Sequence, residues 1–172
     1  MKTLTLALLG MAIMSTSWSP WKIAITSKDE PGEPMVVTGQ VFAPDGITPL
    51  SGMRVYVYHT DARGLYNERN SGTRVPRLKG TMVTNDEGWY EYSTIRPAPY
   101  PGGGVAAHVH YNVSGGGYQE FHDALEFEGD QYLTDKEISE SRSRGRFGSI
   151  QVLTKDKGGV WRCTKDIRME KK

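Results

Sequence analysis

The side chains best suited to chemistry in this sequence belong to two tyrosines and two histidines: Tyr66, Tyr100, His108 and His110. Phenolate oxygens and imidazole nitrogens together suit a hard, highly charged ion such as ferric iron better than they suit zinc. A free phenol has a pKa of about 10, so it becomes an anionic ligand at neutral pH only when a cation lowers that value. If the four side chains meet in space, the sequence predicts a non-haem Fe(III) site that activates an organic substrate.

The two histidines are separated by one residue, which is the spacing of neighbours on one face of a β-strand. Successive strand residues point to opposite faces, so His108 and His110 project together, with Ala106 and Asn112 beside them. The alternate positions are apolar, as expected for a buried face: Val105, Ala107, Val109 and Val113. Histidines at this spacing also occur on ordinary solvent-facing strands, so the pair alone leaves that alternative open.

The two tyrosines lie in loops with distinctive composition. Tyr100 is in Pro-Ala-Pro-Tyr-Pro, residues 97–101, where three prolines restrict the backbone, and three glycines then permit a sharp return toward the histidines. This arrangement favours rigid delivery of one phenol, although a tyrosine covering a sheet edge is an alternative. Tyr66 ends the stretch Asp-Ala-Arg-Gly-Leu-Tyr, residues 61–66, and by itself could be an ordinary loop aromatic.

Short alternating stretches separated by turns predict the elements that must position these side chains. The pattern, with 20 Gly and nine Pro, is typical of an all-β protein, and we expect a single β-sandwich of mostly antiparallel strands. Residues 134–146 are the expected excursion or short helix. The expected strands cover residues 36–42, 53–60, 79–84, 89–95, 105–113, 121–127, 148–153 and 160–167.

The first residues resemble an export signal. Lys2 supplies a positive start, and the apolar run at residues 4–14 is followed by small polar residues. A run of about 11 residues is short of the ~20 needed to cross a bilayer, so we expect no stable membrane span. The prediction is a signal peptide over residues 1–17, with a boundary as late as about residue 27, in an exported (periplasmic or secreted) protein; a retained N-terminal anchor is the alternative.

The rest of the chain divides into three expected parts. Residues 18–34 are rich in Pro and charged residues, which suggests a linker. We expect the β-sandwich over residues 35–168 and a basic tail over residues 169–172. The length of 172 residues suits one domain with a core. The single cysteine, Cys163, excludes an intramolecular disulfide, so an exported protein would depend on its core, its metal or both. A near balance of 21 Lys and Arg against 20 Asp and Glu argues against a nucleic-acid partner.

Several stretches resemble the intradiol ring-cleavage dioxygenases, most closely the protocatechuate 3,4-dioxygenase type. The most specific block runs from Thr-Ile-Arg-Pro, residues 94–97, to His-Val-His, residues 108–110. The resemblance extends from about Met35 to about Ile167. Its other matching stretches are residues 37–41 with 45–46, 55–66, 79–80 with 84–90, 98–101, 125–130 and 159–167.

The resemblance implies a β-sandwich that holds ferric iron by two tyrosines and two histidines. Carried over by motif, the metal ligands are Tyr66, Tyr100, His108 and His110. A catechol-type substrate would displace Tyr100, whose phenolate helps to take a substrate proton, which makes Tyr100 the expected catalytic residue. Dioxygen would then cleave the ring between its hydroxylated carbons to give a muconate-type diacid. The expected partners are a catechol-type small molecule and O2, and a homo-oligomer is compatible with the resemblance.

Three positions depart from the family pattern. Val105 stands where the family usually has an arginine that stabilises negative charge on the ring, Ala124 where it has a glutamine, and Glu126 where it has an aromatic residue. His59 and His122 could substitute as polar groups near the site, but strand-face histidines without a chemical role are the better interpretation.

Two other functions fit parts of the sequence. A β-sandwich could be a binding module for carbohydrate or another ligand, with a structural or vestigial metal site and exposed aromatics such as Trp18, Trp21 and Tyr118. A zinc hydrolase could use His108 and His110 with a carboxylate or a third histidine. The zinc interpretation ranks last because it leaves both loop tyrosines unexplained.

Overall fold

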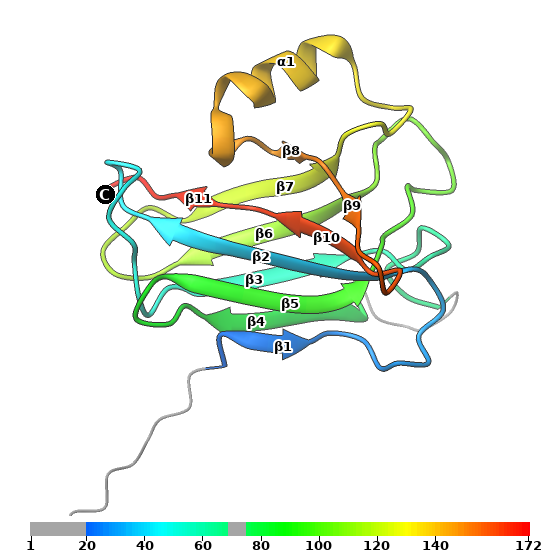
Figure 1. Ribbon diagram of the computed structural model, residues 1–172, viewed down its shortest axis with the longest axis horizontal. Coiled ribbons are helices and arrows are strands. Elements are labelled where there is room, and N and C mark those ends of the chain that lie inside the picture. The colour runs from blue at the N-terminus through cyan, green and yellow to red at the C-terminus, as the bar shows by residue number, and fades with distance from the viewer. Residues whose placement is uncertain (1–19, 69–74) are drawn as a thin grey trace, which may run out of the picture.

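The structure, a computed structural model, describes residues 20–68 and 75–172, and its strands form two layers over a common core (Figure 1). One sheet has the order β1-β5-β2-β10-β9, with β11 also paired to β2. Its strands are β1 (Lys22–Ala24), β2 (Pro34–Phe42), β5 (Trp89–Ile95), β9 (Thr154–Lys155), β10 (Trp161–Thr164) and β11 (Ile167–Arg168). The other sheet, in the order β4-β3-β6-β7-β8, contains β3 (Arg54–His59), β4 (Leu78–Val83), β6 (His108–Ser114), β7 (Phe121–Phe127) and β8 (Ile150–Gln151).

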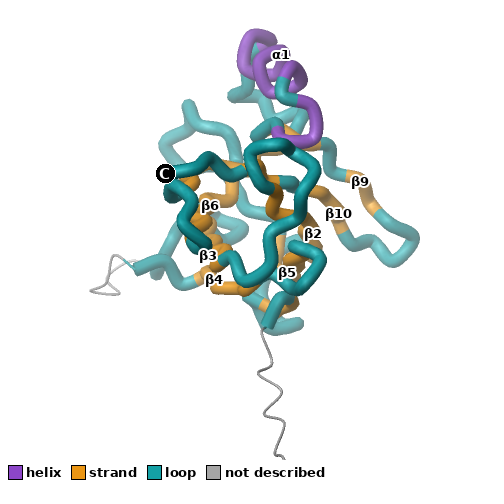
Figure 2. Tube along the Cα trace, turned by 90° about the vertical axis from the view of Figure 1, so that its left-hand side faces the viewer, coloured by secondary structure: helices purple, strands orange, loops and turns teal. Residues whose placement is uncertain are grey.

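The expected β-sandwich is confirmed, and both of its sheets are mixed rather than purely antiparallel. Strands β10 and β11 run parallel to β2, β1 runs parallel to β5, and β7 runs parallel to β8. Figure 2 shows the layers edge-on, with β6, β3 and β4 on one side and β5, β2 and β10 on the other. Parallel neighbours require long connections, so the order of these strands depends on contacts between distant parts of the chain.

Alternation along the strands produces the core. In β3, Val55 and Val57 are fully buried, while Tyr56 and Tyr58 lie on the outer face. Full burial of such an apolar side chain contributes roughly 1.5–3 kcal/mol relative to leaving it exposed. Strand β6 repeats the pattern on its inner face, with Val109, Tyr111 and Val113 buried. The histidines of β6 therefore lie on the face that points away from the sandwich core.

The histidine strand begins later than the sequence pattern suggested. Strand β6 starts at His108, and Val105 is 44% exposed, so the expected place of Val105 in the core is wrong. Gly103 and Gly104 have positive φ angles and turn the chain just before it enters the sheet. The alternation of a strand does not hold until the turn is complete, after which Ala107 and Val109 are buried as expected.

Both ends of the expected domain extend further than the sequence suggested. Residues 22–24 were expected in a linker, but they form β1 because their backbone pairs with β5. The expected basic tail is also partly packed, since Met169 is fully buried and its N–H donates to the carbonyl oxygen of Phe42. The predicted signal peptide, residues 1–17, lies outside the described residues.

The expected strand over residues 160–167 is divided into β10 and β11 at Lys165 and Asp166. The Asp166 carboxylate accepts the N–H of Gln40 at 2.9 Å, which replaces a backbone bond of the β2 ladder. The Lys165 side chain turns inward, where its Nζ lies 2.7 Å from Asp123 and 3.0 Å from the carbonyl oxygen of Gly148. Only residues 150–151 of the expected strand at 148–153 pair with β7.

One helix, α1 (Asp135–Ser143), confirms the excursion expected over residues 134–146, and a short 3-10 turn at Gly145–Phe147 follows it. Thr134 and Glu137 form a reciprocal capping box that satisfies backbone N–H groups at the helix start. The helix lies at the end of the molecule next to β8 (Figure 1). Within residues 20–68 and 75–172, no helix is long and apolar enough to cross a membrane.

Candidate metal site

Four polar atoms of the residues predicted as ligands meet at one end of the outer face of β6. The Tyr66 hydroxyl lies 2.6 Å from the Tyr100 hydroxyl and 2.8 Å from Nε2 of His110. Nε2 of His108 lies 3.1 Å from the Tyr100 hydroxyl and 2.9 Å from Nε2 of His110. The structure thus brings all four side chains into a closed ring of contacts, which we call the quartet.

Strand β6 and its neighbours fix the two imidazoles. Nδ1 of His108 donates to the carbonyl oxygen of Ala106 at 2.7 Å, so in the neutral ring Nε2 carries the lone pair that faces the quartet. The His110 ring stacks on Tyr58 of β3, with ring centres 4.4 Å apart and planes 19° apart. The two imidazole rings are themselves nearly perpendicular, at 88°. Hydrogen bonding orients one ring and stacking orients the other, as is common for metal-binding histidines.

A compact loop after β3 carries Tyr66. The Asp61 carboxylate accepts the N–H groups of Arg63 at 2.9 Å and Leu65 at 3.1 Å, and the Asp61 N–H donates to the carbonyl oxygen of Leu65. Gly64 has a φ of 80°, and a Cβ at this position would lie 2.1 Å from the carbonyl oxygen of Pro99. The Gly64 position therefore permits the close approach of the loops that carry Tyr66 and Tyr100.

The loop that carries Tyr100 is tied to the same region. The Thr60 hydroxyl donates to the carbonyl oxygen of Ala98 at 2.7 Å, and the Ala98 N–H donates to the carbonyl oxygen of Asp61 at 3.2 Å. The Gly103 N–H closes a turn on the carbonyl oxygen of Tyr100 at 2.9 Å. Proline stiffness and these bonds together hold the phenol beside the histidines.

Burial governs the protonation of the quartet. Burial, reinforced by the hydrogen bond to Tyr100, raises the pKa of Tyr66 well above its ordinary value, so this phenol keeps its proton in the absence of a cation. Burial, with a smaller contribution from neighbouring His108, lowers the pKa of His110 to about 4, so this imidazole is neutral at neutral pH. A neutral imidazole is the form that binds metals.

The proton count of the quartet fits a cation better than a set of hydrogen bonds. With one proton on the His108 ring, that proton is used on Ala106, so at most three protons remain for four contacts: two hydroxyl protons and one on His110. One contact must then place two lone pairs face to face. Ligands bound at right angles to one ion at roughly 2.0–2.2 Å lie about 2.8–3.1 Å apart. The contacts of 2.6–3.1 Å are close to that spacing, so the donor set fits a shared metal ion.

No conventional zinc cluster accompanies the histidine pair in the part of the chain that the structure describes. Within residues 20–68 and 75–172, no three His, Cys, Asp or Glu side chains gather in a way that could hold a metal ion. The side chains that contact His108 and His110 at the quartet are the phenols of Tyr66 and Tyr100. A donor set with two phenols favours a ferric ion over zinc.

The three positions that depart from the family pattern differ in their surroundings. Val105 is exposed, while Ala124 and Glu126 lie on β7 directly opposite His110 and His108. Burial raises the pKa of the Glu126 carboxyl group, although neighbouring His108 partly offsets this effect. A hollow of about 170 Å³ next to this strand is lined by Ala124 and by charged side chains, namely Asp123, Glu126, Glu137, Glu140 and Arg144.

Neither of the other two histidines contacts the quartet. His59 is fully buried, where its Nδ1 donates to the carbonyl oxygen of Thr60 and its Nε2 accepts from the Thr94 hydroxyl, both at 2.7 Å. His122 is exposed and bonds Asn112 on the neighbouring strand. The residue that sequence reasoning missed is Tyr58, and its outward position in alternation with Val57 was the signal that could have found it.

Comparisons with known proteins agree with this geometry. A family model described as Dioxygenase matches residues 16–158. Chlorocatechol 1,2-dioxygenase of Rhodococcus opacus is 32% identical over 133 residues, which are 67% of this chain and 51% of that protein. The relatives found by sequence carry catechol-type names, whereas the sequence motifs resembled the protocatechuate type most closely.

Solved structures of similar fold include two dioxygenases. The dioxygenase domain of a dioxygenase and carbohydrate-binding fusion protein from Streptomyces sp. SirexAA-E has a TM-score of 0.67 at 21% identity, over 87% of both chains. Catechol 1,2-dioxygenase from Pseudomonas arvilla C-1 has a TM-score of 0.68 at 26% identity, over 87% of this chain and 56% of that one. The chain spans about half or less of the length of the curated relatives it matches, at 51%, 44% and 36% for three of them.

Proposed function

The chain belongs to the intradiol ring-cleavage dioxygenase family, and we propose that it is a non-haem Fe(III) enzyme acting on a catechol-type diol. In the proposed reaction, both atoms of O2 enter the diol, and the ring bond between the two hydroxylated carbons breaks to give a muconate-type diacid. The observation that carries the proposal is the quartet, whose four contacts exceed the protons available to fill them.

The proposal gives the four ligands two different tasks. Tyr66, His108 and His110 would hold the metal throughout, since their lone pairs converge from β6 and from the loop after β3. Ferric iron, when bound, supplies the Lewis acidity and the redox chemistry that let a catecholate react with dioxygen. Two phenolate ligands would cancel much of the charge of the ion and stabilise its ferric state.

Tyr100 is the ligand proposed to leave when the diol arrives. Its hydroxyl makes the longest contact of the quartet, 3.1 Å to Nε2 of His108. Its backbone carbonyl oxygen accepts the Gly103 N–H in the turn that follows. Once free of the cation, the Tyr100 phenolate oxygen would take a proton from one hydroxyl of the diol. Departure of Tyr100 would leave room beside Tyr66, His108 and His110 for both oxygens of the diol.

An isotope experiment tests the reaction directly. Iron-loaded protein is supplied with catechol under 18O2, and the product is analysed by mass spectrometry. The proposal predicts a muconate-type diacid that contains two 18O atoms. His108→Asn should abolish the product, whereas His122→Asn should not, because His122 is exposed and contacts Asn112 and Glu120 instead of the quartet. A product with no label, or unchanged turnover by His108→Asn, would contradict the proposed function.

We also propose that the protein is exported, on the basis of its first residues. The positive start, short apolar run and small polar residues at positions 1–17 support this proposal. Expression of the full chain followed by fractionation and mass measurement of the recovered protein tests it. Export predicts recovery outside the cytoplasm with a mass that lacks roughly 17–27 N-terminal residues. A full-length mass in the cytoplasm would contradict export without bearing on the metal site.

A further inference from the structure

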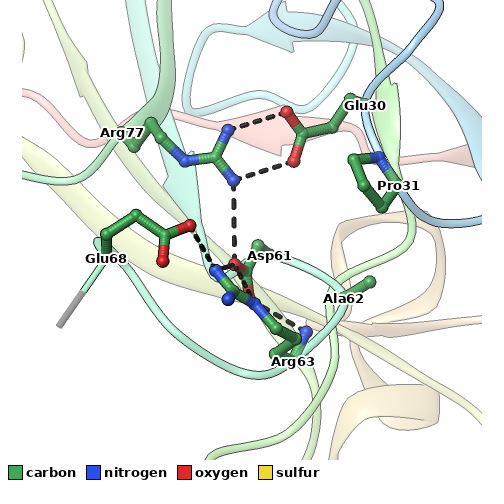
Figure 3. A pocket seen from close by; sticks show the side chains of 7 residues that line it. All are labelled: Glu30, Pro31, Asp61, Ala62, Arg63, Glu68 and Arg77. Carbon is green, nitrogen blue, oxygen red and sulfur yellow. Dashed lines mark hydrogen bonds and ion pairs between the residues drawn. The ribbon is translucent and has the colours of Figure 1, made fainter.

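A cluster of charged side chains lies beside the loop that carries Tyr66 and joins it to the N-terminal segment. Figure 3 shows the Arg77 guanidinium between Glu30 and Asp61. Its two terminal nitrogens donate to the two carboxylate oxygens of Glu30 at 2.7 and 2.8 Å, and one of them lies 3.7 Å from the Asp61 carboxylate. We call Glu30, Arg77 and Asp61 the loop clamp.

The loop clamp differs from an ordinary surface ion pair in the burial of its two carboxylates and in its geometry, while the Arg77 side chain is 38% exposed. The side chains of Glu30 and Asp61 are only 13% and 6% exposed. Exposed single pairs typically contribute little, because solvent and side-chain entropy offset their attraction. A bidentate arginine–carboxylate pair with shielded acceptors is stronger and fixes orientation as well as distance. The Glu30–Arg77 pair can therefore hold one part of the chain at a set position relative to another.

Arg77 connects this pair to Tyr66 through the backbone. The Arg77 N–H donates to the carbonyl oxygen of Tyr66 at 2.9 Å, while the Arg77 side chain is anchored on Glu30. Glu30 comes from the segment between β1 and β2, 47 residues from Arg77 along the chain. A displacement of the Arg77 guanidinium would therefore move the Arg77 backbone, and with it the backbone of Tyr66 and its phenol.

Asp61 extends the loop clamp to the second tyrosine loop. Its carboxylate organises the turn before Tyr66 by accepting two backbone N–H groups, and its carbonyl oxygen accepts the Ala98 N–H next to the Tyr100 segment. The Arg63 side chain completes the partners of this carboxylate, at 2.7 Å. One buried residue, Asp61, therefore contacts both tyrosine loops: its carboxylate bonds the Tyr66 loop and its backbone carbonyl oxygen bonds the Tyr100 loop.

We propose that the loop clamp positions Tyr66 for metal binding, with Arg77 as the positioning residue and Glu30 as its anchor in the N-terminal segment. The part of this inference that concerns metal binding rests on the proposed function, whereas the part that concerns the order of the Tyr66 loop does not require a metal. The segment containing Glu30, which sequence reasoning treated as a linker, then serves the site without touching it. The expected consequence of weakening the loop clamp is a more mobile Tyr66 and a looser quartet.

Amide hydrogen exchange of the metal-free protein tests the loop part. Glu30→Gln keeps the size of the side chain but removes its charge, so peptides covering residues 61–68 should exchange several-fold faster than in the unmodified protein. Glu33→Gln is the matched control, because Glu33 lies in the same segment but pairs with Lys155 at 2.9 Å and Arg96 at 3.8 Å instead of with Arg77. Equal exchange of residues 61–68 in both variants would overturn the inference.

Iron retention and the visible tyrosinate band test the metal part on the iron-loaded protein. Loss of an outer partner of a metal ligand typically costs about 10–100-fold in metal affinity. Glu30→Gln and Arg77→Gln should therefore release iron to a chelator at about 10-fold lower chelator concentration and shift the band, while Glu33→Gln should do neither. Arg77→Lys keeps the charge without the bidentate geometry, so it should retain iron better than Arg77→Gln but less well than the unmodified protein.

The outcomes separate this inference from the proposed function. An unmodified protein that forms no visible band with iron would refute the proposed function and the metal part of the inference together. A normal band in the unmodified protein that Glu30→Gln and Arg77→Gln leave unchanged, at equal iron retention, would refute the inference alone. Native far-UV circular dichroism of every variant is required, so that loss of iron reports the loop and not unfolding.

Discussion

Tyr66 is the residue on which the proposed site depends most, because its hydroxyl contacts both the other phenol and a histidine. Tyr100 also has two partners, but one of its contacts, at 3.1 Å, is the longest of the quartet. Tyr58 lies next to the same group without joining it, since it contacts His110 through its ring face. Hydroxyl groups at these three positions should therefore have very different effects on a bound metal.

The first prediction compares two tyrosines of the same face. Tyr66→Phe removes a ligand oxygen, so the iron-loaded variant should lose the Tyr66 contribution to its visible tyrosinate band, keep that of Tyr100, and lose about 10-fold or more of its iron affinity. Tyr58→Phe preserves the ring that stacks on His110 and should leave the band nearly unchanged. Visible spectra at matched iron content provide the measurement. An equal effect of the two substitutions would contradict the ligand assignment.

The second prediction concerns the charge of the substrate. Glu126 lies opposite His108, in a hollow that contains three further acidic side chains and one arginine. A carboxylate at this position should repel a substrate carboxylate, so unsubstituted catechol should bind more tightly than a catechol with a ring carboxylate. Glu126→Gln should reduce that preference at least about 10-fold, because unit charges within about 12 Å of each other near a protein surface interact by roughly 1.4 kcal/mol or more. Titration of the visible band with each diol measures both affinities, and an unchanged ratio would refute the role of Glu126.

The third prediction follows from the buried histidine. Burial lowers the pKa of His59 from 6.5 to about 4, and the smaller effects of Glu30, Asp61 and the Thr60 carbonyl oppose that shift. The unfolded chain therefore binds a proton before the folded protein as the pH falls, so stability is complete above about pH 6.5 and declines toward pH 4. Between pH 7 and pH 5 the expected loss from this residue is about 2 kcal/mol.

Urea unfolding of the metal-free protein at several pH values measures this loss. His59→Asn retains a donor for the carbonyl oxygen of Thr60 but cannot titrate, so its unfolding free energy should depend less on pH than that of the unmodified protein. The variant should also be less stable at pH 7, because Thr94 loses its acceptor. Parallel pH profiles for the two proteins would show that His59 is not the group responsible.

At the scale of elements, the close approach of two loops builds the quartet. The loop after β3 supplies Tyr66 and the proline-rich loop before β6 supplies Tyr100, and at Gly64 the backbone lies so close to Pro99 that a Cβ has no room. Sequence composition predicted that each loop would be distinctive, since prolines and glycines are visible in the sequence. The contact between the loops could not be predicted in this way, because it depends on the distance between the ends of β3 and β6 in the sheet.

The fourth prediction tests that contact with two glycines of similar backbone. Gly64→Ala places a Cβ against Pro99 in addition to straining a φ of 80°, so it should separate the loops and lower iron affinity by about 10-fold or more. Gly52→Ala introduces comparable strain at a φ of 70°, but nothing lies within 4 Å of its new Cβ. It should lower stability by roughly 1 kcal/mol without affecting the metal. Similar iron affinities for the two variants would exclude a steric role for Gly64.

Strands with clear alternation were predicted well, and those defined by distant partners were not. Strands β5 and β7 have the bounds expected from the sequence, because their apolar and polar residues alternate between recognisable turns. Strand β1 has three residues and no pattern of its own, and it exists because the edge of β5 offers it hydrogen bonds. The break between β10 and β11 depends on Lys165 reaching Asp123, a contact across 42 residues.

At the scale of the whole molecule, both ends of the described chain contribute to the domain. The N-terminal segment adds β1 to one sheet and Glu30 to the loop clamp, and the C-terminal segment adds β11 and buried Met169 to the core. The histidine pair and Tyr100 stood out by residue type and local spacing, whereas Tyr66 was assigned as a ligand through the resemblance to the family. The sequence could not predict the loop clamp, because the pairing of Glu30 with Arg77 requires the folded arrangement of both sheets.

The visible absorption spectrum of the purified protein, with iron and zinc quantified on the same sample, tests the central claim most directly. The spectrum is recorded after ferric loading, before and after addition of a catechol. The account predicts a tyrosinate band at about one iron per chain that shifts when the catechol binds. A protein that stays colourless after ferric loading, or that retains zinc in place of iron, would contradict it.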